Sequence, residues 1–341
     1  MRSFVVGLGS MGKRRVRNLR ALGIDGIVGT DIRPDRCEEA RAKYGIRTVP
    51  DFAAGMALDP DIVIISTPPD AHLGYARQAV EAGKHVFSEF SWTEDLSELD
   101  ALDALCTDKG VVGAPSCTQR YQDSVRRMRD LVGDGAIGNV ILLLFHSGQW
   151  APDWHPWEPI TDFYLGHKAR GGGREQVSFE LDWIRWVMGG IDHVSAVARK
   201  MTTLPADIDD LYQVTLGFEN GAVGSVTVDM IQRAPNRLCV VMSEIGQMVW
   251  DYTAGILRLY RAADGKWVEH REPEGMSGYL SEGKTEDEPM YGAEIRAFLD
   301  AVEGKAVFPN RYRDERSLLA VVHAIERSSA EGRRIYVEKR S

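Results

Sequence analysis

The sequence predicts a two-domain α/β protein, with a doubly wound parallel sheet followed by an α+β domain that holds a large, mostly antiparallel open sheet. In the first third of the chain, short apolar strand patterns alternate with helical patterns, and repeated strand–helix units build parallel sheets. Further on, period-2 alternation over 223–228 and hairpin turns at Asn220-Gly221 and Asp264-Gly265 favour antiparallel strands. We place the domain boundary between residues 117 and 118.

Length, charge and cysteine usage narrow the class of protein. A chain of 341 residues suits two domains, and a net charge of −9 argues against nucleic acid as a partner. Met1 leads straight into a strand, and apolar runs such as 140–145 are too short to cross a membrane. We therefore expect a cytoplasmic protein. The four cysteines are far apart, which predicts reduced thiols and neither a metal site nor a disulfide.

The strands and helices of the first domain follow one another at regular spacing. Each strand is apolar and several of the helices end at a glycine, as is typical of alternating units. The predicted strands are 1–6, 26–30, 61–67, 84–89 and 110–114, and the predicted helices are 13–22, 35–44, 71–82 and 96–106.

The second domain is predicted to place helices on one side of its sheet. Its expected helices are 123–132, 291–302 and 315–330, and its expected strands are 139–146, 211–218, 222–228, 237–243 and 248–252. Residues 271–288 are polar and contain glycine, which predicts a mobile loop. Strands such as 223–228 are expected to place apolar side chains on the uncovered face. Such a face usually marks an interface, so we expect a homodimer or homotetramer.

A glycine-rich turn directly follows the first predicted strand. It carries G-x-G-x-x-G as Gly7, Gly9 and Gly12, with Ser10 and Met11 opening the next helix. The first glycine allows a tight turn, the second lets the backbone approach a pyrophosphate, and the third lets the helix pack on the strand. The helix N-terminus presents N–H groups to the phosphates. The sequence therefore predicts a Rossmann domain that binds a dinucleotide.

An acidic residue at the end of the second strand supports this prediction. Asp31 stands 24 residues after Gly7, where the fingerprint expects a carboxylate that holds a ribose hydroxyl. A carboxylate repels a 2′-phosphate, so NAD is favoured over NADP, although Arg33 softens that preference. The basic run 13–15 is interpreted as a solvated face of the helix.

Other residues follow the third and fourth strands of the first domain. Ligands of open α/β sheets lie at the carboxyl ends of the strands. We therefore expect Thr67, Pro68, His72 and Glu89 beside the cofactor.

Several motifs together give the chain a family resemblance. These are Thr67-Pro68-Pro69-Asp70-Ala71-His72, which looks like a T-P-x-x-x-H cofactor loop, the turn 118–121, the glycine turn 171–173 and the stretch Trp154-His155-Pro156-Trp157-Glu158. Across essentially its whole length the chain resembles the glucose–fructose oxidoreductase / inositol dehydrogenase / MocA (Gfo/Idh/MocA) family. The resemblance implies a nicotinamide-dependent oxidoreductase that acts on a sugar, a cyclitol or a sugar acid.

The sequence departs from the family pattern at two catalytic positions. The family reads E-K-P after the fourth strand, and its lysine touches substrate and cofactor, whereas this chain has Glu89-Phe90-Ser91. The family also carries a histidine in the helix after the glycine turn, where this chain has Phe179. Phenylalanine neither removes a hydroxyl proton nor stabilises an alkoxide. We therefore predict a rearranged set of acid–base groups.

The candidate replacements lie in the second domain. Glu175 follows the glycine turn, His155 lies between tryptophans, and Lys168 precedes the turn, so these three are the predicted catalytic residues. The predicted substrate-binding residues combine aromatic rings that stack on a sugar with polar groups that hold it. They are Arg120, Tyr121, Trp154, Trp157 and Glu180.

Three functions remain open from the sequence. The first is an NAD-dependent oxidoreductase of a carbohydrate-like substrate with a non-standard acid–base set. The second is a redox-neutral enzyme, such as an epimerase, a lyase or a hydrolase, that uses tightly bound NAD. The third is a non-catalytic NAD-binding protein.

Overall fold

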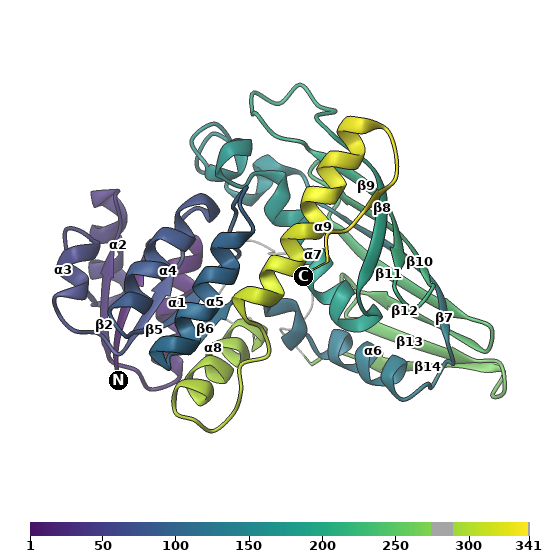
Figure 1. The fold of residues 1–341 in the computed structure, drawn as a ribbon, viewed down its shortest axis with the longest axis horizontal. Coiled ribbons are helices and arrows are strands. Elements are labelled where there is room, and N and C mark those ends of the chain that lie inside the picture. Colours follow the sequence, from purple (N-terminus) through teal and green to yellow (C-terminus); the bar gives the residue numbers. More distant parts are fainter. Residues whose placement is uncertain (274–288, 340–341) are drawn as a thin grey trace. The chain divides into compact units, whose positions relative to one another are not determined.

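The computed structural model describes residues 1–273 and 289–339, which form two compact units (Figure 1). Unit 1 consists of residues 1–118 and 285–316, and unit 2 of residues 119–284 and 317–341. The chain therefore returns to unit 1 after the sheet of unit 2. The predicted loop 271–288 lies outside the described residues from position 274 onward, and Arg271 is the last residue of a strand.

Unit 1 contains the predicted doubly wound parallel sheet. Its six strands have the order β3-β2-β1-β4-β5-β6, and each neighbouring pair is parallel. This order reverses between β1 and β4, which is where dinucleotides bind in such sheets. The strands are β1 (Arg2–Val6), β2 (Gly26–Thr30), β3 (Arg47–Thr48), β4 (Ile62–Ile65), β5 (His85–Ser88) and β6 (Gly113–Pro115).

Helices connect these strands at nearly the predicted positions. Helix α2 shows the local reason, since Pro34 begins it and Gly45 ends it with a φ of 57°. The sequence analysis missed β3 and α3, which are too short to show a periodic pattern. The helices of this part are α1 (Ser10–Ala21), α2 (Pro34–Tyr44), α3 (Phe52–Met56), α4 (His72–Glu81) and α5 (Ser97–Lys109).

Helix α8 (Pro289–Val302) belongs to unit 1 although it follows unit 2 in the sequence. Its Phe298 packs on Phe87 of β5, with ring centroids 5.7 Å apart, and both rings are fully buried. This helix was expected in the second domain, 118–341, and the structure places it in unit 1 instead, because its apolar side chains pack on β5. Helix α9 (Tyr312–Glu331) contributes its first turn to unit 1 and the remainder to unit 2.

Unit 2 is built on a nine-stranded, mostly antiparallel sheet, as predicted. The order is β14-β13-β12-β11-β7-β10-β9-β8-β15, and among the described strands of this sheet only β7 and β10 pair in parallel. The strands are β7 (Val140–Gly148), β8 (Ile191–Arg199), β9 (Leu211–Phe218), β10 (Val223–Asp229), β11 (Asn236–Ser243), β12 (Gly246–Asp251), β13 (Ile256–Arg261), β14 (Lys266–Arg271) and β15 (Ile335–Tyr336). Strands β8 and β15 were not predicted, and β13 and β14 were indicated only by the hairpin turn at Asp264-Gly265.

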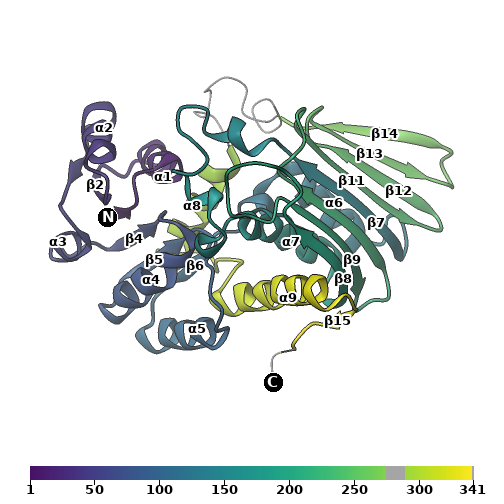
Figure 2. The same ribbon diagram turned by 90° about the horizontal axis from the view of Figure 1, so that it is seen from above.

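Helices cover one face of this sheet (Figure 2). Helices α6 (Asp123–Gly133) and α7 (Gly173–Met188) lie on that face together with the later turns of α9. Trp183 of α7 packs between Phe145 and Trp250, with ring centroids 5.2 and 5.3 Å away. On the described part of the chain, the opposite face carries no helix.

The uncovered face corrects one detail of the prediction. In β10, Val226 and Val228 are buried on the helix side, and of the valines in 223–228 only Val223 points outward. Since side chains alternate along a strand, β10 exposes Val223, Ser225 and Thr227 instead. The apolar part of this face comes chiefly from neighbouring strands. Leu144 on β7 is 39% exposed and pairs with Val240 on β11, which in turn pairs with Val249 on β12.

Burial also determines the reactivity of the cysteine thiols. All four thiols are buried, and burial raises the pKa of Cys106 to about 12. A thiol with so high a pKa is a poor nucleophile. Within residues 1–273 and 289–339, no helix combines the length and the apolar composition that crossing a membrane requires.

Candidate functional site

The glycine turn of unit 1 has the close packing that the motif predicts. Gly7 has a φ of 90°, and a Cβ atom there would lie 2.5 Å from the carbonyl oxygen of Ser66. A Cβ on Gly12 would lie 1.8 Å from the carbonyl oxygen of Gly7. These two glycines are therefore required by the fold itself, whether or not a ligand is bound.

Gly9 differs from its two neighbours in the motif. A Cβ on Gly9 would meet no atom closer than 3.5 Å, and the nearest is Nη1 of Arg36. Gly9 is the N-cap residue of helix α1 and offers no side-chain hydrogen bond to the helix, and Ser10 is exposed. The first N–H groups of a helix lack intrahelical partners, so this turn presents donors to an anion. The open space at Gly9 and the uncapped helix fit the pyrophosphate of a dinucleotide.

Asp31 lies at the glycine turn, at the end of β2. Its carboxylate accepts hydrogen bonds from the backbone N–H groups of Leu8 at 2.7 Å and Arg33 at 2.9 Å. It therefore holds the turn and the start of α2 together. The Arg33 side chain pairs instead with Asp35, at 2.6 Å between exposed groups.

Arg36 is a cationic residue that the sequence analysis missed. Its Nη1 atom is 3.8 Å from Oδ2 of Asp31 and lies next to Gly9. A guanidinium between the acid of β2 and the glycine turn can bind a phosphate oxygen. The signal in the sequence was an arginine at the start of the helix that follows the acid.

The end of β4 supplies the next residues of the site. Ser66 has a buried hydroxyl without a hydrogen-bond partner among the described residues, beside Gly7 and Gly12. A buried polar atom of this kind needs a partner, and a bound cofactor would supply one. Thr67 and Pro68 follow at half-buried positions. The sequence analysis named these two and missed Ser66.

His72 is placed behind the loop rather than on its surface. The ring is 1% exposed, with Nε2 2.6 Å from the carbonyl oxygen of Thr67 and Nδ1 2.8 Å from that of Phe90. Burial lowers the pKa of the His72 imidazole, against the opposing effects of the Thr67 carbonyl and the Glu89 carboxylate. Since both ring nitrogens face backbone carbonyls, His72 braces the two loops that follow β4 and β5.

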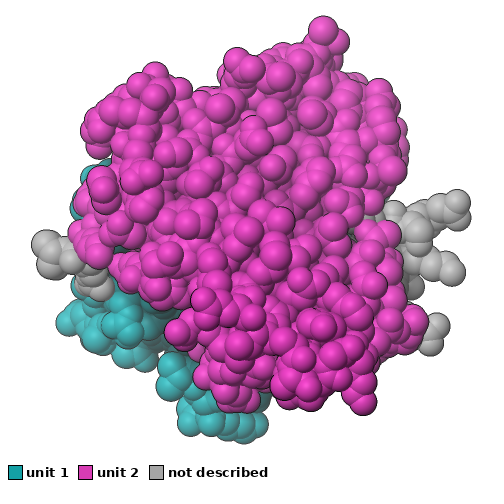
Figure 3. Space-filling model, turned by 90° about the vertical axis from the view of Figure 1, so that its right-hand side faces the viewer, with its two compact units in different colours: residues 1–118, 285–316 teal, residues 119–284, 317–341 magenta. Residues whose placement is uncertain are grey.

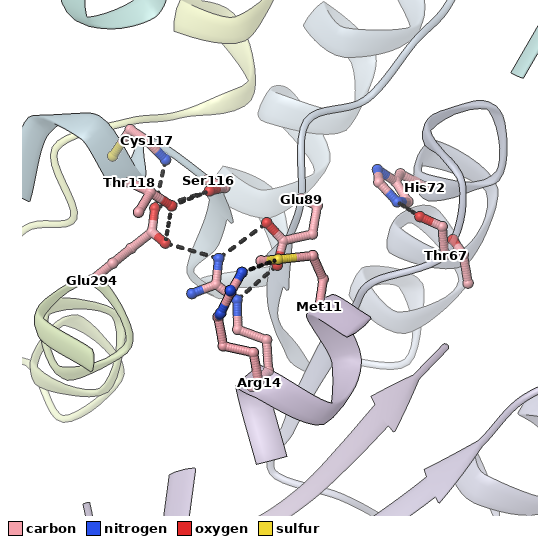
Figure 4. A network of polar contacts seen from close by, with 10 residues as sticks. Met11, Arg14, Thr67, His72, Glu89, Ser116, Cys117, Thr118 and Glu294 are labelled. Atoms are coloured by element: carbon pink, nitrogen blue, oxygen red, sulfur yellow. Dashed lines mark hydrogen bonds and ion pairs between the residues drawn. The ribbon is translucent and has the colours of Figure 1, made fainter. Parts of the chain in front are cut away.

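Glu89 lies just after β5 in a buried network of charges (Figure 4). Arg15 of α1 donates Nε and Nη2 to the two Glu89 oxygens, at 2.7 and 3.0 Å, and Nη2 also contacts Glu294 of α8 at 2.9 Å. The Arg15 and Glu294 side chains are fully buried, and that of Glu89 is 12% exposed. The interpretation of 13–15 as a solvated face is therefore wrong for Arg14 and Arg15, which are both buried. The Arg15 guanidinium is paired with Glu89, just after β5, and with Glu294 on α8, a helix from a distant part of the sequence.

The pKa values of Arg15 and Glu294 depend on the charged groups with which each is paired. Burial alone lowers the pKa of Arg15, but Glu89 and Glu294 more than offset it and raise that pKa above its ordinary value. Burial raises the pKa of the Glu294 carboxyl above its ordinary value, with a contribution from the Glu89 carboxylate, although Arg15, Thr118 and the Cys117 N–H act to lower it. Glu294 accepts hydrogen bonds from the Cys117 N–H at 2.6 Å and from the hydroxyl groups of Thr118 at 2.7 Å and Ser116 at 3.0 Å.

In unit 2, the first turn of α7 carries Glu175. Its carboxylate accepts a hydrogen bond from the hydroxyl group of Tyr164, which lies in the short 3-10 helix Tyr164–Gly166. Glu175 and Phe179 are one helical turn apart, and both are half-buried. Sequence reasoning did not find Tyr164, because an isolated tyrosine in an irregular stretch has no pattern.

An aromatic cluster surrounds His155. Its ring stacks on Phe163 at 3.8 Å between centroids and lies 4.7 Å from that of Trp157, and its Nδ1 is 2.8 Å from Glu158. Trp157 is 71% exposed, which is unusual for so large an apolar side chain. Phe163 also packs edge-on against Tyr164. The structure thus links His155 and Trp157 to the Tyr164–Glu175 pair. Trp154 is half-buried, and its indole N–H has no hydrogen-bond partner among the described residues.

Lys168 and Arg120 each form an ion pair within unit 2. The Lys168 ammonium is 2.6 Å from Asp209, and 39% of its side chain is exposed. Arg120 binds both oxygens of Asp182, with Nε 2.9 Å from Oδ2. Tyr121 is buried beneath the guanidinium of Arg126, which is 4.9 Å from its ring centroid.

Glu180 is not placed as a substrate ligand. It is 2% exposed, and its oxygens accept from Nε of Arg237 at 3.0 Å and Nε1 of Trp183 at 2.8 Å. It lies on the side of α7 that faces the sheet, so the prediction of substrate binding is corrected to a structural ion pair with β11. No three His, Cys, Asp or Glu side chains gather into a metal-binding group in the part of the chain that the structure describes.

Comparison with known proteins agrees with this geometry. Residues 1–115 match an oxidoreductase family described by its NAD-binding Rossmann fold, and residues 125–247 match the GFO/IDH/MocA C-terminal domain. Levoglucosan dehydrogenase of Pseudarthrobacter phenanthrenivorans is 27% identical over 250 residues, which cover 64% of this chain and 63% of that protein. Inositol 2-dehydrogenase of Rhizobium meliloti is 24% identical over an alignment of 353 residues that covers 97% of this chain and 99% of that protein.

Solved structures share the fold over the whole chain. Levoglucosan dehydrogenase in complex with NADH and levoglucosan superposes with a TM-score of 0.84 at 22% identity, covering 100% of both chains. The WlbA dehydrogenase from Bordetella pertussis, in complex with NADH and UDP-GlcNAcA, has a TM-score of 0.80 at 18% identity and covers 100% of this chain and 99% of that one. With its Rossmann sheet, glycine turn and mostly antiparallel second sheet, the chain belongs to the Gfo/Idh/MocA family of NAD-dependent oxidoreductases.

Proposed function

We propose that this protein oxidises a secondary alcohol of a sugar, a cyclitol or a sugar-acid derivative with NAD, using an acid–base set that differs from the family pattern. The observation that carries the proposal is the combination of an intact pyrophosphate turn in unit 1 with an exposed aromatic residue and a tyrosine–glutamate pair in unit 2. The named relatives act on levoglucosan and inositol, which are polyhydroxylated rings. NAD is favoured over NADP because the Asp31 carboxylate lies at the glycine turn.

The residues of unit 1 have the properties that NAD binding needs. Ser10, Met11 and Gly9 offer the helix N-terminus to the pyrophosphate, and Asp31 offers a carboxylate to the adenosine ribose. Glu89, Thr67 and Pro68 lie at the carboxyl ends of β4 and β5, on the nicotinamide side of the reversal in strand order. Bound NAD supplies the acceptor for the hydride that leaves the alcohol carbon.

The proton of the alcohol requires a separate acceptor. In the proposed reading, Phe90 and Phe179 stand where the family has its lysine and histidine, and Phe90 is 8% exposed. Glu175 then takes the proton, either directly or through the Tyr164 hydroxyl that it binds. A carboxylate that already accepts one hydrogen bond is held in a fixed orientation, as a general base must be.

The substrate-binding part of the proposal rests on aromatic stacking. The exposed face of Trp157 suits the apolar face of a sugar ring, and His155, which Glu158 orients, adds a polar group beside it. Trp154 presents an indole N–H that a substrate hydroxyl can satisfy.

Gly9→Ala tests the cofactor half of the proposal. We expect roughly tenfold to hundredfold weaker NADH binding, because a Cβ displaces charge-assisted hydrogen bonds to the pyrophosphate that contribute about 1.5–3 kcal/mol. The fold should be unchanged, since the Cβ meets no atom closer than 3.5 Å. Titration followed by tryptophan fluorescence measures the affinity. The matched control is Gly74→Ala in α4, where a Cβ meets nothing within 4 Å; equal affinities of the two variants would contradict the assignment.

A panel of polyols, cyclitols and sugar acids with NAD tests the reaction itself. The expected result is reduction of NAD, measured by the nicotinamide absorbance, with at least one member of the panel. Phe90→Lys is the informative variant. If the native protein reduces no NAD with any compound but the lysine variant does, a redox-neutral or non-catalytic function replaces the proposal.

We further propose that copies of this chain associate through the uncovered face of the unit 2 sheet. Figure 3 shows unit 2 as a broad surface on the side where Figure 1 places its strands. Leu144, Val240 and Val249 are paired across neighbouring strands on the face without helices. Exposed apolar surface of this kind is typical of an interface.

Leu144→Glu should therefore dissociate the assembly. The native protein is expected to have the mass of a dimer or tetramer by light scattering at micromolar concentration, and the variant a lower mass, because a charge cannot be buried in an apolar interface without a partner. Val307→Glu is the matched control, since Val307 is 88% exposed and lies in unit 1. A monomeric mass for the native protein would refute the interface.

A further inference from the structure

We propose that Glu89 and Glu294, both held by Arg15, make the nicotinamide site favour the oxidised, positively charged cofactor over the reduced one. The inference rests on the proposed use of NAD and goes beyond it, since it assigns an oxidation-state preference to two carboxylates. One of them, Glu294, lies on α8, 279 positions after Arg15 in the sequence.

The first step is the placement of Glu89. It directly follows β5, and β5 lies beyond the point where the strand order reverses between β1 and β4. A dinucleotide crosses this point, with one half over each group of strands. The acid of β2 marks the adenosine half, so the carboxyl end of β5 belongs to the nicotinamide half. The Glu89 side chain retains 12% exposure there.

The second step concerns the charges of Arg15, Glu89 and Glu294 at the carboxyl end of β5. Arg15 is the cation that both carboxylates contact, at 2.7 Å for Glu89 and 2.9 Å for Glu294. When both carboxylates are ionised, they carry one negative charge more than the Arg15 guanidinium that they share. Oε1 of Glu294 accepts from the Cys117 N–H and Oε2 from Arg15, so each oxygen has a donor that cannot act as an acceptor. Such hydrogen bonds favour the ionised form and act against burial and the Glu89 carboxylate, which raise the pKa of Glu294.

The third step is the effect of that charge on the cofactor. The nicotinamide ring is a cation when oxidised and neutral when reduced. A buried negative charge therefore stabilises the oxidised form selectively, and burial limits screening by salt. Arg14 on the same helix acts in the opposite direction. Figure 4 draws it in the same network, with Nη1 2.8 Å from Sδ of Met11.

The experiment measures dissociation constants for three ligands, NAD+, NADH and ADP-ribose, on the full-length protein by calorimetry. ADP-ribose lacks the nicotinamide ring, so it reports on the adenosine half and the fold. Glu89→Gln should raise the ratio of the NAD+ to the NADH dissociation constant about threefold to tenfold, the order of effect expected for one partly screened unit charge. Glu294→Gln should raise it by a smaller factor, and Arg14→Gln should lower it.

Two control variants separate charge from structure. Ser116→Ala removes one hydrogen bond to Glu294 and no charge, so the ratio should stay unchanged. Glu81→Gln removes the same charge from an exposed position at the end of α4, where water and salt screen it. Thermal melting confirms that each variant is folded, and Glu89→Gln carries the test if Glu294→Gln does not fold.

The outcomes distinguish the inference from the function on which it depends. An unchanged ratio in both glutamate variants, with all three ligands bound, overturns the inference and leaves the proposed function in place. An equal loss of affinity for all three ligands also overturns the inference, because the carboxylates would then act only by stabilising the fold. If the native protein binds neither NAD+ nor NADH, the proposed function fails and the inference fails with it.

Discussion

Glu175→Gln is expected to lower the turnover of the carbohydrate-like substrate by roughly 10²–10⁴-fold, the usual contribution of a positioned general base. The amide keeps the size of the side chain and its contact with the Tyr164 hydroxyl, but it cannot take up a proton at neutral pH. The NADH dissociation constant should stay unchanged, because Glu175 belongs to unit 2 and the pyrophosphate turn to unit 1. Initial rates at saturating NAD measure the effect.

Three further variants define how Glu175 acts. Tyr164→Phe removes the hydroxyl that Glu175 accepts from and should lower turnover less than the loss of the carboxylate does. His155→Asn should mainly raise KM, since the aromatic cluster is proposed to bind the ring rather than to transfer its proton. Glu38→Gln is the control, an exposed glutamate on α2. Near-native rates for both Glu175→Gln and His155→Asn would refute the catalytic assignment.

Arg15→Met is expected to destabilise unit 1 by about 3–5 kcal/mol, because it leaves two buried carboxylates without their shared cation. Methionine retains much of the aliphatic volume, so the loss is chiefly electrostatic. The Arg15 side chain is fully buried, lies 4.6 Å from the centroid of the Phe87 ring and has one terminal nitrogen without a hydrogen-bond partner among the described residues. Chemical unfolding followed by circular dichroism measures the shift in midpoint.

Lys13→Met provides the comparison on the same helix. Lys13 pairs with Glu39 at 2.7 Å, but the two side chains are 19% and 47% exposed. Surface pairs contribute about 0–1 kcal/mol, so this variant should unfold close to the native midpoint. If Arg15→Met unfolds no earlier than Lys13→Met, the buried network does not stabilise the protein as described.

The sequence was most informative where the physics is local. Gly7 and Gly12 could be identified because only glycine tolerates a φ of 90° or a backbone approach that leaves no room for a Cβ, and Gly9 was identified by its spacing from them. Hairpins at Asn220-Gly221 and Asp264-Gly265 were predicted because these residue pairs suit tight turns. Strand–helix alternation then implied the parallel sheet.

Long polar side chains were less predictable, because their partners lie far away in the sequence. Arg120 and Asp182 are 62 positions apart, and Glu180 and Arg237 are 57 apart. Arg120 and Glu180 looked available for a substrate when considered alone. Tertiary packing brings opposite charges together, and a buried charge must be paired.

By itself, the sequence determined the two sheet types, the dinucleotide turn and the acid at the end of β2. Only the tertiary structure decided that α8 returns to unit 1, that Arg15 is buried between Glu89 and Glu294, and that Glu175 meets Tyr164. The physical reason is the distance along the sequence over which each interaction acts. Backbone conformation and hydrophobic periodicity are set by neighbours within a few residues, whereas the pairing of buried charges depends on which distant segments the core brings into contact.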